Sequence, residues 1–431
     1  MEARLRRRTL TSAEYTPPGD KSISHRALIL SAMSHGENII TGLPASVDVL
    51  ATKRCLQNLG VKMQDTKGSL LVLGEGVSGF ISPSQALDCE NSGTTMRLLA
   101  GVLAGSSVQA ILKGDASLTA RPMRRVVLPL RTMGAQITSP TDGAYPPLSV
   151  SGRELRAGKW HMTVPSAQVK SAILLAALSA TGESQVTYDL LTRDHTERML
   201  AYFGAKIETT PGHITLSPGP LTPKPVIIPG DISSVAYFAV LAAVTPGARL
   251  VVRGTGLNPG RSEFLRVLSE MGAKITVHKT TEIPEPMGDI VVEGGELRGV
   301  VIDGETIPSM IDELPILAVA AAMAQGRTIV RGAQELRVKE SDRITSLVGE
   351  LSKMGVRAQE LFDGFVIDGG YPLRAAAVSA HDDHRITMTL AIAACLCESG
   401  ETVISGAEAA AISYPDFFAD LLRLTEGDDY A

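Results

Sequence analysis

The sequence predicts an α/β protein of two domains, each a prism with buried helices inside, surrounded by sheets and outer helices. Three observations predict this fold class: a helix–glycine–strand pattern that recurs along the chain, an apolar-helix pattern that alternates with it, and two proline-rich crossings. The 431 residues are 44% hydrophobic and 20% charged, an ordinary globular composition that suits two or three domains.

The first pattern joins the end of a helix to a glycine and then to the start of a strand. Its copies are LQNLGVKM, LRTMGAQI, LAYFGAKI, LSEMGAKI and LSKMGVRA, which begin at residues 56, 130, 200, 268 and 351. Glycine commonly ends a helix because it adopts the left-handed conformation without steric cost. The expected helix ends are Gly60, Gly134, Gly204, Gly272 and Gly355, with a frayed sixth copy, LLRLTEG, at Gly427.

The second pattern is a polar turn that opens a helix of small apolar residues and ends at a glycine before a strand. Its closing glycines are Gly36, Gly105, Gly182, Gly247, Gly326 and Gly400. The first helix of each repeat is apolar on nearly all faces, and such a helix is buried. The second helix carries charges, as in RVLSEMGAK, and should lie between core and solvent. We therefore expect six repeats of about 70 residues.

Two stretches rich in proline and glycine, TPPGD (16–20) and SPGPLTPKPVIIPGD (217–231), indicate where the chain crosses between domains. Two crossings imply that one domain is inserted into the other. We expect domain one over residues 1–16 plus 227–431 and domain two over residues 17–226, with three repeats in each. The two crossings would form a hinge, and a cleft between the domains could close on a ligand.

Composition and missing motifs exclude several classes of protein. The net charge of −5 speaks against a general nucleic-acid or membrane-surface binder, and no apolar run reaches the roughly 18 residues that span a bilayer. The basic N-terminus lacks the apolar core of a signal peptide. The four cysteines indicate a reducing compartment, and Cys395 and Cys397 are expected to pack in the core. Phosphate-loop, dinucleotide and zinc-binding motifs are missing from the sequence, so nothing indicates a cofactor or metal.

The first turns of the six predicted buried helices carry an unusual set of polar side chains. In chain order these are Lys21, Ser22 and Arg26; Asn91, Ser92, Gly93, Thr94 and Arg97; Ser166, Gln168 and Lys170; Asp231, Ser233 and Ser234; Asp312 and Glu313; and Asp382, Asp383, His384 and Arg385. If the repeats pack about a pseudo-threefold axis in each domain, these turns gather at one end. Free N–H groups and the helix dipole favour an anion there. Taken singly, Ser22, Ser92, Asp231, Asp383 and Asp312 could instead be plain helix caps.

Further cations strengthen the prediction of an anion site. Arg26 and Arg97 sit in otherwise apolar helices, where a buried unpaired arginine is costly and an anionic ligand would offset the cost. Arg121 lies just before an expected Pro-started helix, and Arg193 lies at another helix entrance. The segment ELRVKESDRI holds Lys339, and its Glu340 and Arg343 are three residues apart, which would place them on one helix face. They form either a weak surface pair or a carboxylate held for proton transfer.

Eight ordered motifs between about residues 17 and 419 carry a resemblance to a known family. They are PGDKSISHRALILSAM, NSGTTMRLLAG, GDASLTARPM, PSAQVKSA, RDHTE, DELPILAVAAA, VKESDRI and DDHRITM. Together they resemble the 5-enolpyruvylshikimate-3-phosphate synthase (3-phosphoshikimate 1-carboxyvinyltransferase) family. The resemblance implies the enolpyruvyl transferase fold, a two-domain inside-out α/β prism of six βαβαββ-type repeats with three in each domain.

The resemblance also implies transfer of the enolpyruvyl group from phosphoenolpyruvate to the 5-hydroxyl of shikimate 3-phosphate, with release of phosphate through a tetrahedral intermediate. This chemistry needs an acid/base pair and dense cations but no cofactor. The implied partners are the two small-molecule substrates and the inhibitor glyphosate, with no nucleic acid and no membrane. The implied protein is a cytoplasmic monomer.

The resemblance assigns roles by motif position. Contacts to shikimate 3-phosphate are expected from Lys21, Ser22, Arg26, Ser166, Ala167 through its backbone, Gln168, Arg193, Asp312 and Lys339. Contacts to phosphoenolpyruvate are expected from Lys21, Gly93, Arg121, Gln168, Arg343 and Arg385. The expected catalytic residues are Asp312, which would accept the proton of the 5-hydroxyl, Glu340, which would serve C3, and Lys21, which would touch both substrates.

Two positions depart from the family pattern. Many members carry two cations before the proline of the RPM motif, and here Ala120 precedes Arg121. One branch carries a lysine where Ile412 stands, so this chain resembles the branch without it. Both losses would weaken phosphoenolpyruvate affinity. Gly93 keeps the small residue that is associated with sensitivity to glyphosate, which occupies the phosphoenolpyruvate site.

Three other functions remain as alternatives. The sister enzyme that acts on UDP-N-acetylglucosamine carries a reactive cysteine in the loop equivalent to GDASLTARPM, and no cysteine lies there. An RNA-processing enzyme with a related repeat is disfavoured by the charge of −5 and the missing basic stripe. A non-catalytic anion-binding protein on the same scaffold would not need Asp312 or Glu340.

Overall fold

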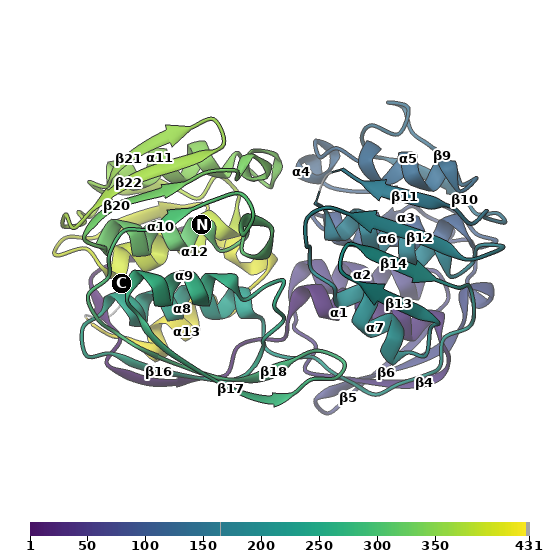
Figure 1. Ribbon diagram of the computed structural model, residues 1–431, viewed down its shortest axis with the longest axis horizontal. Helices are drawn as coiled ribbons and strands as arrows, with labels where there is room; N and C mark the ends of the chain where they lie inside the picture. Colours follow the sequence, from purple (N-terminus) through teal and green to yellow (C-terminus); the bar gives the residue numbers. More distant parts are fainter. Residues whose placement is uncertain (164, 428–431) are drawn as a thin grey trace. The chain divides into compact units, whose positions relative to one another are not determined.

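The computed structural model describes residues 1–163 and 165–427 and divides into two compact units (Figure 1). Unit 1 comprises Met1–Pro18, Gly230–Glu282 and the chain from Pro286 onward. Unit 2 comprises Gly19–Pro229 together with Ile283–Glu285, a three-residue segment that the sequence pattern did not predict there. Each unit has its own hydrophobic core.

Three four-stranded sheets surround the core of unit 2. Their strand orders are β15-β4-β6-β5, β7-β8-β10-β9 and β11-β12-β14-β13. The first pair in each sheet is parallel and the other pairs are antiparallel. The strands are β4 (His35–Thr41), β5 (Lys62–Thr66), β6 (Ser69–Glu75), β7 (Leu87–Asp88), β8 (Gln109–Lys113), β9 (Gln136–Thr138), β10 (Leu148–Ser151), β11 (Lys159–Met162), β12 (Ser184–Tyr188), β13 (Ile207–Thr210), β14 (His213–Leu216) and β15 (Val226–Ile227).

Unit 1 also has three sheets around its core, two of four strands, β17-β18-β16-β3 and β19-β20-β22-β21, and one of three strands, β1-β24-β23. In the last sheet the N-terminal strand β1 pairs antiparallel with β24, so the start of the chain completes the sixth repeat. A two-stranded sheet, β2-β25, joins the two ends of the described chain. The strands are β1 (Glu2–Leu5), β2 (Arg8–Thr9), β3 (Ser12–Tyr15), β16 (Arg249–Gly256), β17 (Lys274–Thr281), β18 (Met287–Glu293), β19 (Val301–Ile302), β20 (Gly326–Val330), β21 (Arg357–Leu361), β22 (Gly364–Gly369), β23 (Ala377–Ser379), β24 (Thr402–Ser405) and β25 (Glu426–Gly427).

Each of the two crossings is preceded by a strand that stays in the unit from which the chain departs. Strand β3 comes just before the first helix of unit 2, yet it pairs in parallel with β16 of unit 1. Strand β15 comes just before the first helix of the returning unit 1, yet it pairs in parallel with β4 of unit 2. Each crossing segment is therefore held by backbone hydrogen bonds in a sheet of the unit that it leaves.

The first helix of each repeat is buried, as its apolar composition predicts. These inner helices are α1 (Lys21–Met33), α3 (Gly93–Ala104), α6 (Ala167–Ala177), α8 (Ile232–Val244), α10 (Leu314–Met323) and α12 (His384–Cys395). Every residue of α8 and of α12 is buried. Helices of this kind gain their stability from packing on all sides, so they form the centre of each unit.

The second helix of each repeat buries one face and exposes the other, which confirms its expected outer position. These helices are α2 (Val47–Asn58), α5 (Arg124–Thr132), α7 (His195–Tyr202), α9 (Glu263–Met271), α11 (Arg343–Lys353) and α13 (Phe417–Leu424). Short helical segments complete the chain: α4 (Ala116–Thr119), η1 (Val77–Gly79), η2 (Ile307–Ser309), η3 (Gln334–Val338) and η4 (Ala407–Ile412).

Five of the six glycines predicted to follow the outer helices do so with positive φ. The φ angles are 94° at Gly60, 98° at Gly134, 84° at Gly204, 118° at Gly272 and 88° at Gly355. The sixth prediction is wrong, because Gly427 lies in β25 and pairs with Arg8 of β2. Helix α13 ends at Leu424 with an extended residue, Thr425, since the chain is drawn directly into that small sheet.

Within the described residues, no helix combines the length and the apolar character needed to cross a membrane. All four cysteines are free and buried, and Cys395 and Cys397 pack in the core of unit 1 as expected. Across the same residues, no group of three or more His, Cys, Asp or Glu side chains is placed to hold a metal ion.

Close packing of α3 against α6 gives a test of the unit 2 core. A Cβ at Gly101 of α3 would lie 2.3 Å from the carbonyl oxygen of Ala172 in α6, and backbone cannot yield as a side chain can. A Cβ at Gly349, inside α11, would meet no atom within 4 Å. The two glycines are therefore a matched pair that differs only in the space around them.

We expect Gly101→Ala to lower the free energy of unfolding by about 1–3 kcal/mol, because the added methyl group forces the two helices apart. Gly349→Ala should raise it by about 0.5–1 kcal/mol, because alanine restricts the unfolded chain and favours the helix. Urea unfolding followed by circular dichroism measures both changes. Equal effects of the two substitutions would contradict the close helix contact.

Candidate functional site

The inner helices of unit 2 begin with polar side chains that belong to the cap or to the first turns. Asp20 caps α1 by accepting from the Ile23 N–H at 2.9 Å, so the expected alternative of Ser22 as the cap is wrong. Ser92 caps α3 through Thr95 N–H, and Ser166 caps α6 through Val169 N–H. We call the residues at these three helix starts, together with Arg121 that bonds to one of them, the unit 2 cluster: Lys21, Ser22, Arg26, Asn91, Gly93, Arg97, Arg121, Ser166 and Gln168.

Arg26 is a buried cation whose hydrogen-bond acceptors are neutral. Its side chain is 4% exposed and donates to Thr196 Oγ1 at 2.7 Å, Ser171 Oγ at 2.7 Å and the carbonyl oxygen of Ser22 at 2.8 Å. Burial lowers the pKa of Arg26 to about 10, partly against the charges of Glu197 and Glu285. The guanidinium therefore stays charged near neutral pH and is available to an anion.

Lys21, in contrast, has a carboxylate partner. Its Nζ lies 2.9 Å from Asp48 Oδ2, which the outer helix α2 supplies from its first turn. Arg193 lies two residues before α7, half-buried, and is close enough to Arg26 to help lower the pKa of that arginine. The structure thus places the predicted residues of α1 and of the α7 entrance in one part of unit 2.

Two further arginines converge on the start of α3. Arg97 donates to Gln168 Oε1 at 2.6 Å, and Gln168 donates in turn to Thr94 Oγ1 at 2.9 Å. Arg121 donates to Asn91 Oδ1 at 2.5 Å. A Cβ at Gly93 would lie 2.7 Å from Arg97 Nη1 and 3.5 Å from Arg121 Nη1, so both guanidinium groups border the same glycine.

The helix expected to start at the proline beside Arg121 begins later than predicted. Helix α5 starts at Arg124 after Met123, two residues beyond Pro122. The backbone N–H of Arg121 instead bonds to the carbonyl of Leu118, at the end of the short helix α4. This turn holds the Arg121 side chain toward α3.

Two buried pairs of a basic and an acidic side chain lie near Arg26 in unit 2. Lys170 Nζ is 2.5 Å from Glu197 Oε1, and both side chains are almost fully buried. His195 Nδ1 is 2.8 Å from Glu285 Oε1, in the short segment that joins unit 2. Burial raises the pKa of Glu197 although the charge of Lys170 lowers it. Glu197 and Glu285 therefore face Lys170 and His195, whereas Arg26 donates to hydroxyl and carbonyl oxygens.

In unit 1 the inner helices begin at carboxylates. Asp231 caps α8 and Asp383 caps α12, each by accepting a backbone N–H, while Glu313 at the start of α10 makes no side-chain cap bond. We call the charged side chains around these three helix starts the unit 1 cluster: Asp231, Arg261, Asp312, Glu313, Lys339, Glu340, Arg343, Asp383 and Arg385.

Arg343 is the centre of the unit 1 cluster and is 1% exposed. It donates to Asp383 Oδ2 at 2.8 Å, Glu340 Oε2 at 2.6 Å and Asp312 Oδ1 at 3.2 Å. Burial alone would lower the pKa of Arg343, but the three carboxylates raise it above its usual value. Lys339 Nζ lies 4.0 Å from Asp312 Oδ1 on the same side of the group.

The expectation that Glu340 and Arg343 share a helix face is wrong, although the two side chains do form an ion pair. Helix α11 begins at Arg343, and Asp342 is its cap, so Glu340 lies in the turn before the helix. That turn, rather than helical spacing, brings the carboxylate back to the guanidinium. Asp312 likewise does not cap α10, since it contacts Arg343 instead.

Arg385 lies at the start of α12, with Glu313 Oε1 3.8 Å from its Nη1. Ser233 donates to Glu313, and Arg261 donates to Ser233 Oγ at 2.5 Å and to Asp231 Oδ1 at 3.3 Å. The nearby charges of Glu313, Asp312 and Asp231 raise the pKa of Arg385, against its burial and together with Tyr237. The unit 1 cluster is thus a network of alternating cations and carboxylates.

Sequence reasoning missed several residues that complete the two clusters. Asp48, Ser171 and Thr196 hold the cations of α1, while Arg261 and Tyr237 support the starts of α8 and α12. Asp48 had a weak signal as an acid in the first turn of an outer helix. The others stand in loops or helices where no local pattern marks them.

The two clusters differ in what they can do. The cations of the unit 2 cluster are mostly held by hydroxyl, amide and carbonyl oxygens, which suits binding of phosphate and carboxylate groups. The unit 1 cluster holds Asp312 and Glu340, whose side chains are 16% and 17% exposed and touch Arg343. Partly exposed carboxylates beside a guanidinium can accept and return protons.

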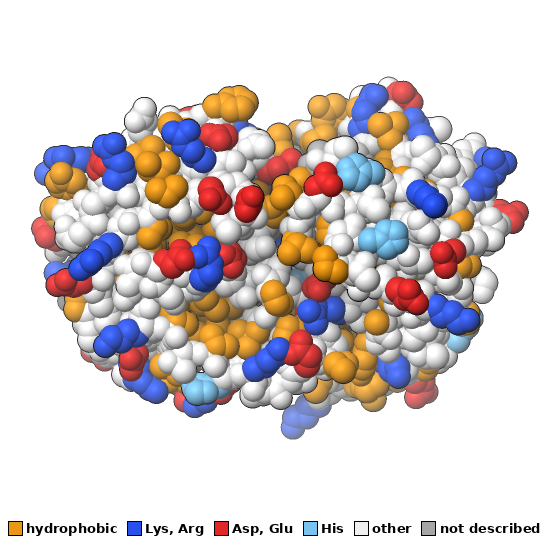
Figure 2. Space-filling view, in the orientation of Figure 1, with side chains coloured by type: hydrophobic (Ala, Val, Ile, Leu, Met, Phe, Trp, Pro, Cys, Tyr) orange, Lys and Arg blue, Asp and Glu red, His pale blue; other side chains and the backbone are white. Residues whose placement is uncertain are grey.

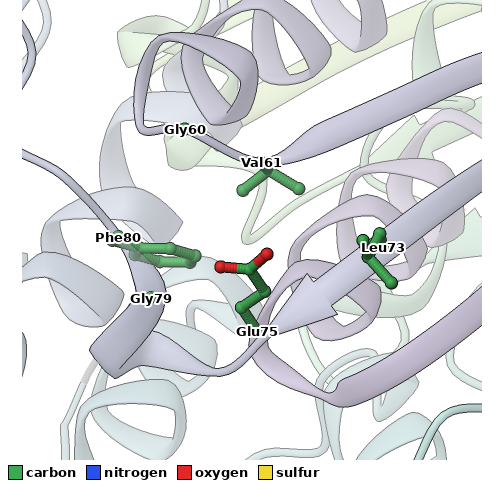
Figure 3. A pocket seen from close by; sticks show the side chains of 6 residues that line it. All are labelled: Gly60, Val61, Leu73, Glu75, Gly79 and Phe80. Atoms are coloured by element: carbon green, nitrogen blue, oxygen red, sulfur yellow. The ribbon is translucent and has the colours of Figure 1, made fainter.

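A small pocket elsewhere in unit 2 lacks these properties. It is lined by Gly60, Val61, Leu73, Glu75, Gly79 and Phe80. Figure 3 shows the Glu75 carboxylate lying between Val61 and the ring of Phe80. Its only charged lining group is an acid, so this pocket does not fit an anionic ligand.

Comparisons with known proteins agree with the motifs. The family described as EPSP synthase (3-phosphoshikimate 1-carboxyvinyltransferase) matches residues 6–421. The 3-phosphoshikimate 1-carboxyvinyltransferase of Carboxydothermus hydrogenoformans is 48% identical over 96% of this chain and 97% of its own length. That of Synechocystis is 47% identical over 95% and 93%. The EPSP synthase structure from Acinetobacter baumannii superposes with a TM-score of 0.88 at 39% identity and covers 99% of both chains. The chain therefore belongs to the EPSP synthase family.

Proposed function

We propose that this protein transfers the enolpyruvyl group of phosphoenolpyruvate to the 5-hydroxyl of shikimate 3-phosphate and releases inorganic phosphate. Family membership over residues 6–421 is the observation that carries the proposal. The reaction is a step of the shikimate pathway, which leads to chorismate and the aromatic amino acids. Both substrates are small and multiply anionic, and the cations of the unit 2 cluster suit such molecules.

The chemistry is an addition followed by an elimination. The 5-hydroxyl of shikimate 3-phosphate adds to C2 of phosphoenolpyruvate while C3 accepts a proton. The tetrahedral adduct then loses phosphate as C3 gives up a proton. The addition removes a proton from the hydroxyl and delivers one to C3, and the elimination removes a proton from C3. Both steps redistribute negative charge, so they need positioned carboxylates and fixed cations.

The residues assigned to shikimate 3-phosphate come from both clusters. In unit 2 they are Lys21, Ser22, Arg26, Ser166, the backbone of Ala167, Gln168 and Arg193, and in unit 1 they are Asp312 and Lys339. Arg26 supports this assignment best, because a buried guanidinium whose hydrogen bonds go to neutral oxygens can still pair directly with an anion.

The residues assigned to phosphoenolpyruvate are Lys21, Gly93, Arg121, Gln168, Arg343 and Arg385. Gly93 suits this role because a side chain there would meet Arg97 and crowd Arg121. Arg97 was not assigned to the substrate, yet it borders the same glycine and bonds to Gln168. Its charge adds to the positive potential at this helix start.

The assigned catalytic carboxylates are Asp312 and Glu340, with Lys21 as the cation that touches both substrates. Asp312 would accept the proton of the 5-hydroxyl, and Glu340 would serve C3. Arg343 contacts both carboxylates, which fixes their direction. This shared guanidinium supports the assignment of paired proton transfers.

Further parts of the proposal concern partners and state. We assign glyphosate as an inhibitor at the phosphoenolpyruvate site, and the protein as a cytoplasmic monomer that binds no nucleic acid. The four buried, free cysteines fit a reducing compartment. On the face drawn in Figure 2, cationic and acidic side chains alternate within each unit, and no basic stripe runs across either.

The proposal predicts that phosphate is released only when both substrates are present. Lys21→Met should abolish release, because the ammonium group that both anions share is lost. Inorganic phosphate is measured with time after mixing protein, shikimate 3-phosphate and phosphoenolpyruvate. Lys62→Met, at an exposed lysine of β5, serves as the control and should keep full activity. Release from phosphoenolpyruvate alone would point to a different reaction.

Carboxylate variants separate an enzyme from a protein that only binds anions. Asp312→Asn and Glu340→Gln should each lower kcat by about 100-fold or more, since each removes one proton acceptor and keeps the side-chain shape. Shikimate 3-phosphate binding, followed by calorimetry, should persist in the Glu340 variant. The exposed Glu305→Gln is the control. Unchanged turnover in both variants would refute the catalytic assignment.

Gly93→Ala should weaken glyphosate inhibition and raise the KM for phosphoenolpyruvate. The new methyl group would lie 2.7 Å from Arg97 Nη1, so this guanidinium must shift and the space beside Arg121 shrinks. Inhibition is measured as phosphate release over a glyphosate series. Gly219→Ala, where a Cβ meets no atom within 4 Å, should leave the inhibition curve in place. If both variants kept wild-type glyphosate sensitivity, the placement of Gly93 at the phosphoenolpyruvate site would be wrong.

A further inference from the structure

Four buried polar side chains form a continuous hydrogen-bonded chain through unit 2. His25 Nδ1 lies 2.7 Å from Thr52 Oγ1, and Thr52 Oγ1 lies 2.6 Å from Thr95 Oγ1. Thr95 Oγ1 donates to Ser92 Oγ at 2.7 Å. All four side chains are fully shielded from solvent. These four hydrogen-bonded side chains join α1, α2 and the cap of α3. None of the four is assigned to a substrate.

The hydrogens in this chain can run in only one direction at these distances. A hydroxyl has one hydrogen, and that of Thr95 is given to Ser92. Thr52 must therefore donate to Thr95, and His25 must donate to Thr52 from Nδ1. The second contact of Thr95, to the carbonyl of Asp48, is much longer at 3.5 Å. The imidazole of His25 is consequently the tautomer that carries its hydrogen on Nδ1.

Both ends of the chain border groups that are assigned to substrates. His25 stands on α1 between Lys21 and Arg26. Ser92 caps α3 by accepting the Thr95 N–H at 3.2 Å, directly before Gly93. Asn91, on the other side of Ser92, holds Arg121. A shift of Ser92 would therefore move the backbone on which the space between Arg97 and Arg121 depends.

We propose that His25 and Thr52 are positioning residues for phosphoenolpyruvate, which fix the first turn of α3 against α1 through Thr95 and Ser92. The inference rests on the proposed function and deepens it. Neither residue touches substrate in this assignment. They act by setting where Gly93 and Arg121 stand relative to Lys21.

A second buried hydroxyl on the same helix provides a matched control. Ser31 of α1 is fully buried, and its Oγ has no hydrogen-bond partner within the described residues. A hydroxyl can therefore be buried on α1 without being linked to other side chains by hydrogen bonds. Ser31→Ala removes a hydroxyl from the same core without touching the four linked side chains.

The test compares Michaelis constants for the two substrates in single variants. Thr52→Val keeps the side-chain shape and removes the central hydroxyl, which should raise the KM for phosphoenolpyruvate about fivefold. The KM for shikimate 3-phosphate should change less than about twofold. His25→Leu should behave like Thr52→Val, whereas His25→Asn, whose amide N–H can replace Nδ1–H, should recover most of the wild-type value. Ser31→Ala should match wild type in both constants.

A double variant measures whether Thr52 and Thr95 act through the same series of hydrogen bonds. The double variant Thr52→Val/Thr95→Val should raise the phosphoenolpyruvate KM little beyond the single variants, because one break already disconnects the chain. If Thr52→Val unfolds the protein, the KM for phosphoenolpyruvate of His25→Leu is compared with that of His25→Asn, and this comparison tests the inference. Lower thermal stability with an unchanged KM, or equal rises for both substrates, would overturn the inference. Wild-type protein that releases no phosphate would instead overturn the proposed function, and this inference with it.

Discussion

The structure depends on how polar helix starts are satisfied inside an apolar core. Six helices run through the centres of the two units, and their first turns carry charged and hydroxyl side chains where water is scarce. A buried polar group without a partner costs as much as several ordinary contacts contribute. The ends of the inner helices must therefore find partners from other repeats, and those partners decide what each end can do.

The two units solve this problem in different ways. In unit 1 the arginines face carboxylates, as Arg343 does with Asp383, Glu340 and Asp312. In unit 2 Arg26 faces hydroxyl and carbonyl oxygens. A guanidinium that is matched by carboxylates serves mainly to fix those carboxylates, whereas one held by neutral oxygens keeps its charge for a ligand. The same repeat thus yields a carboxylate-rich cluster in one unit and a cluster with neutral oxygens around Arg26 in the other.

The sequence predicted those features that depend on residues close together in the sequence. Apolar helices, glycine helix ends and buried arginines follow from periodicity and composition, and the structure confirms them at α8, at Gly272 and at Arg26. The sequence did not predict contacts between residues that are far apart in the sequence. Thr196 reaches Arg26 from 170 residues away, and β3 pairs with β16 rather than with its own repeat.

Predictions from sequence patterns were also wrong where a hydrogen bond outside the pattern changed the backbone. Glu340 and Arg343 have helical spacing, but Asp342 between them accepts the Thr345 N–H and starts the helix later. Gly427 has the composition of a helix stop, but pairing with Arg8 extends the chain instead. In both cases a hydrogen bond that the pattern did not contain decided the backbone.

Helix α1 shows how one element can serve several partners at once. Successive residues on a helix point about 100° apart, so neighbours in sequence face different elements. Lys21 meets α2 through Asp48, His25 meets α2 and α3 through Thr52, and Arg26 meets α6 and α7 through Ser171 and Thr196. Because all three contacts leave one rigid helix, a displacement of α1 would move the cations of both proposed substrates together. Precise placement of α1 is therefore the condition on which the geometry of the unit 2 cluster rests.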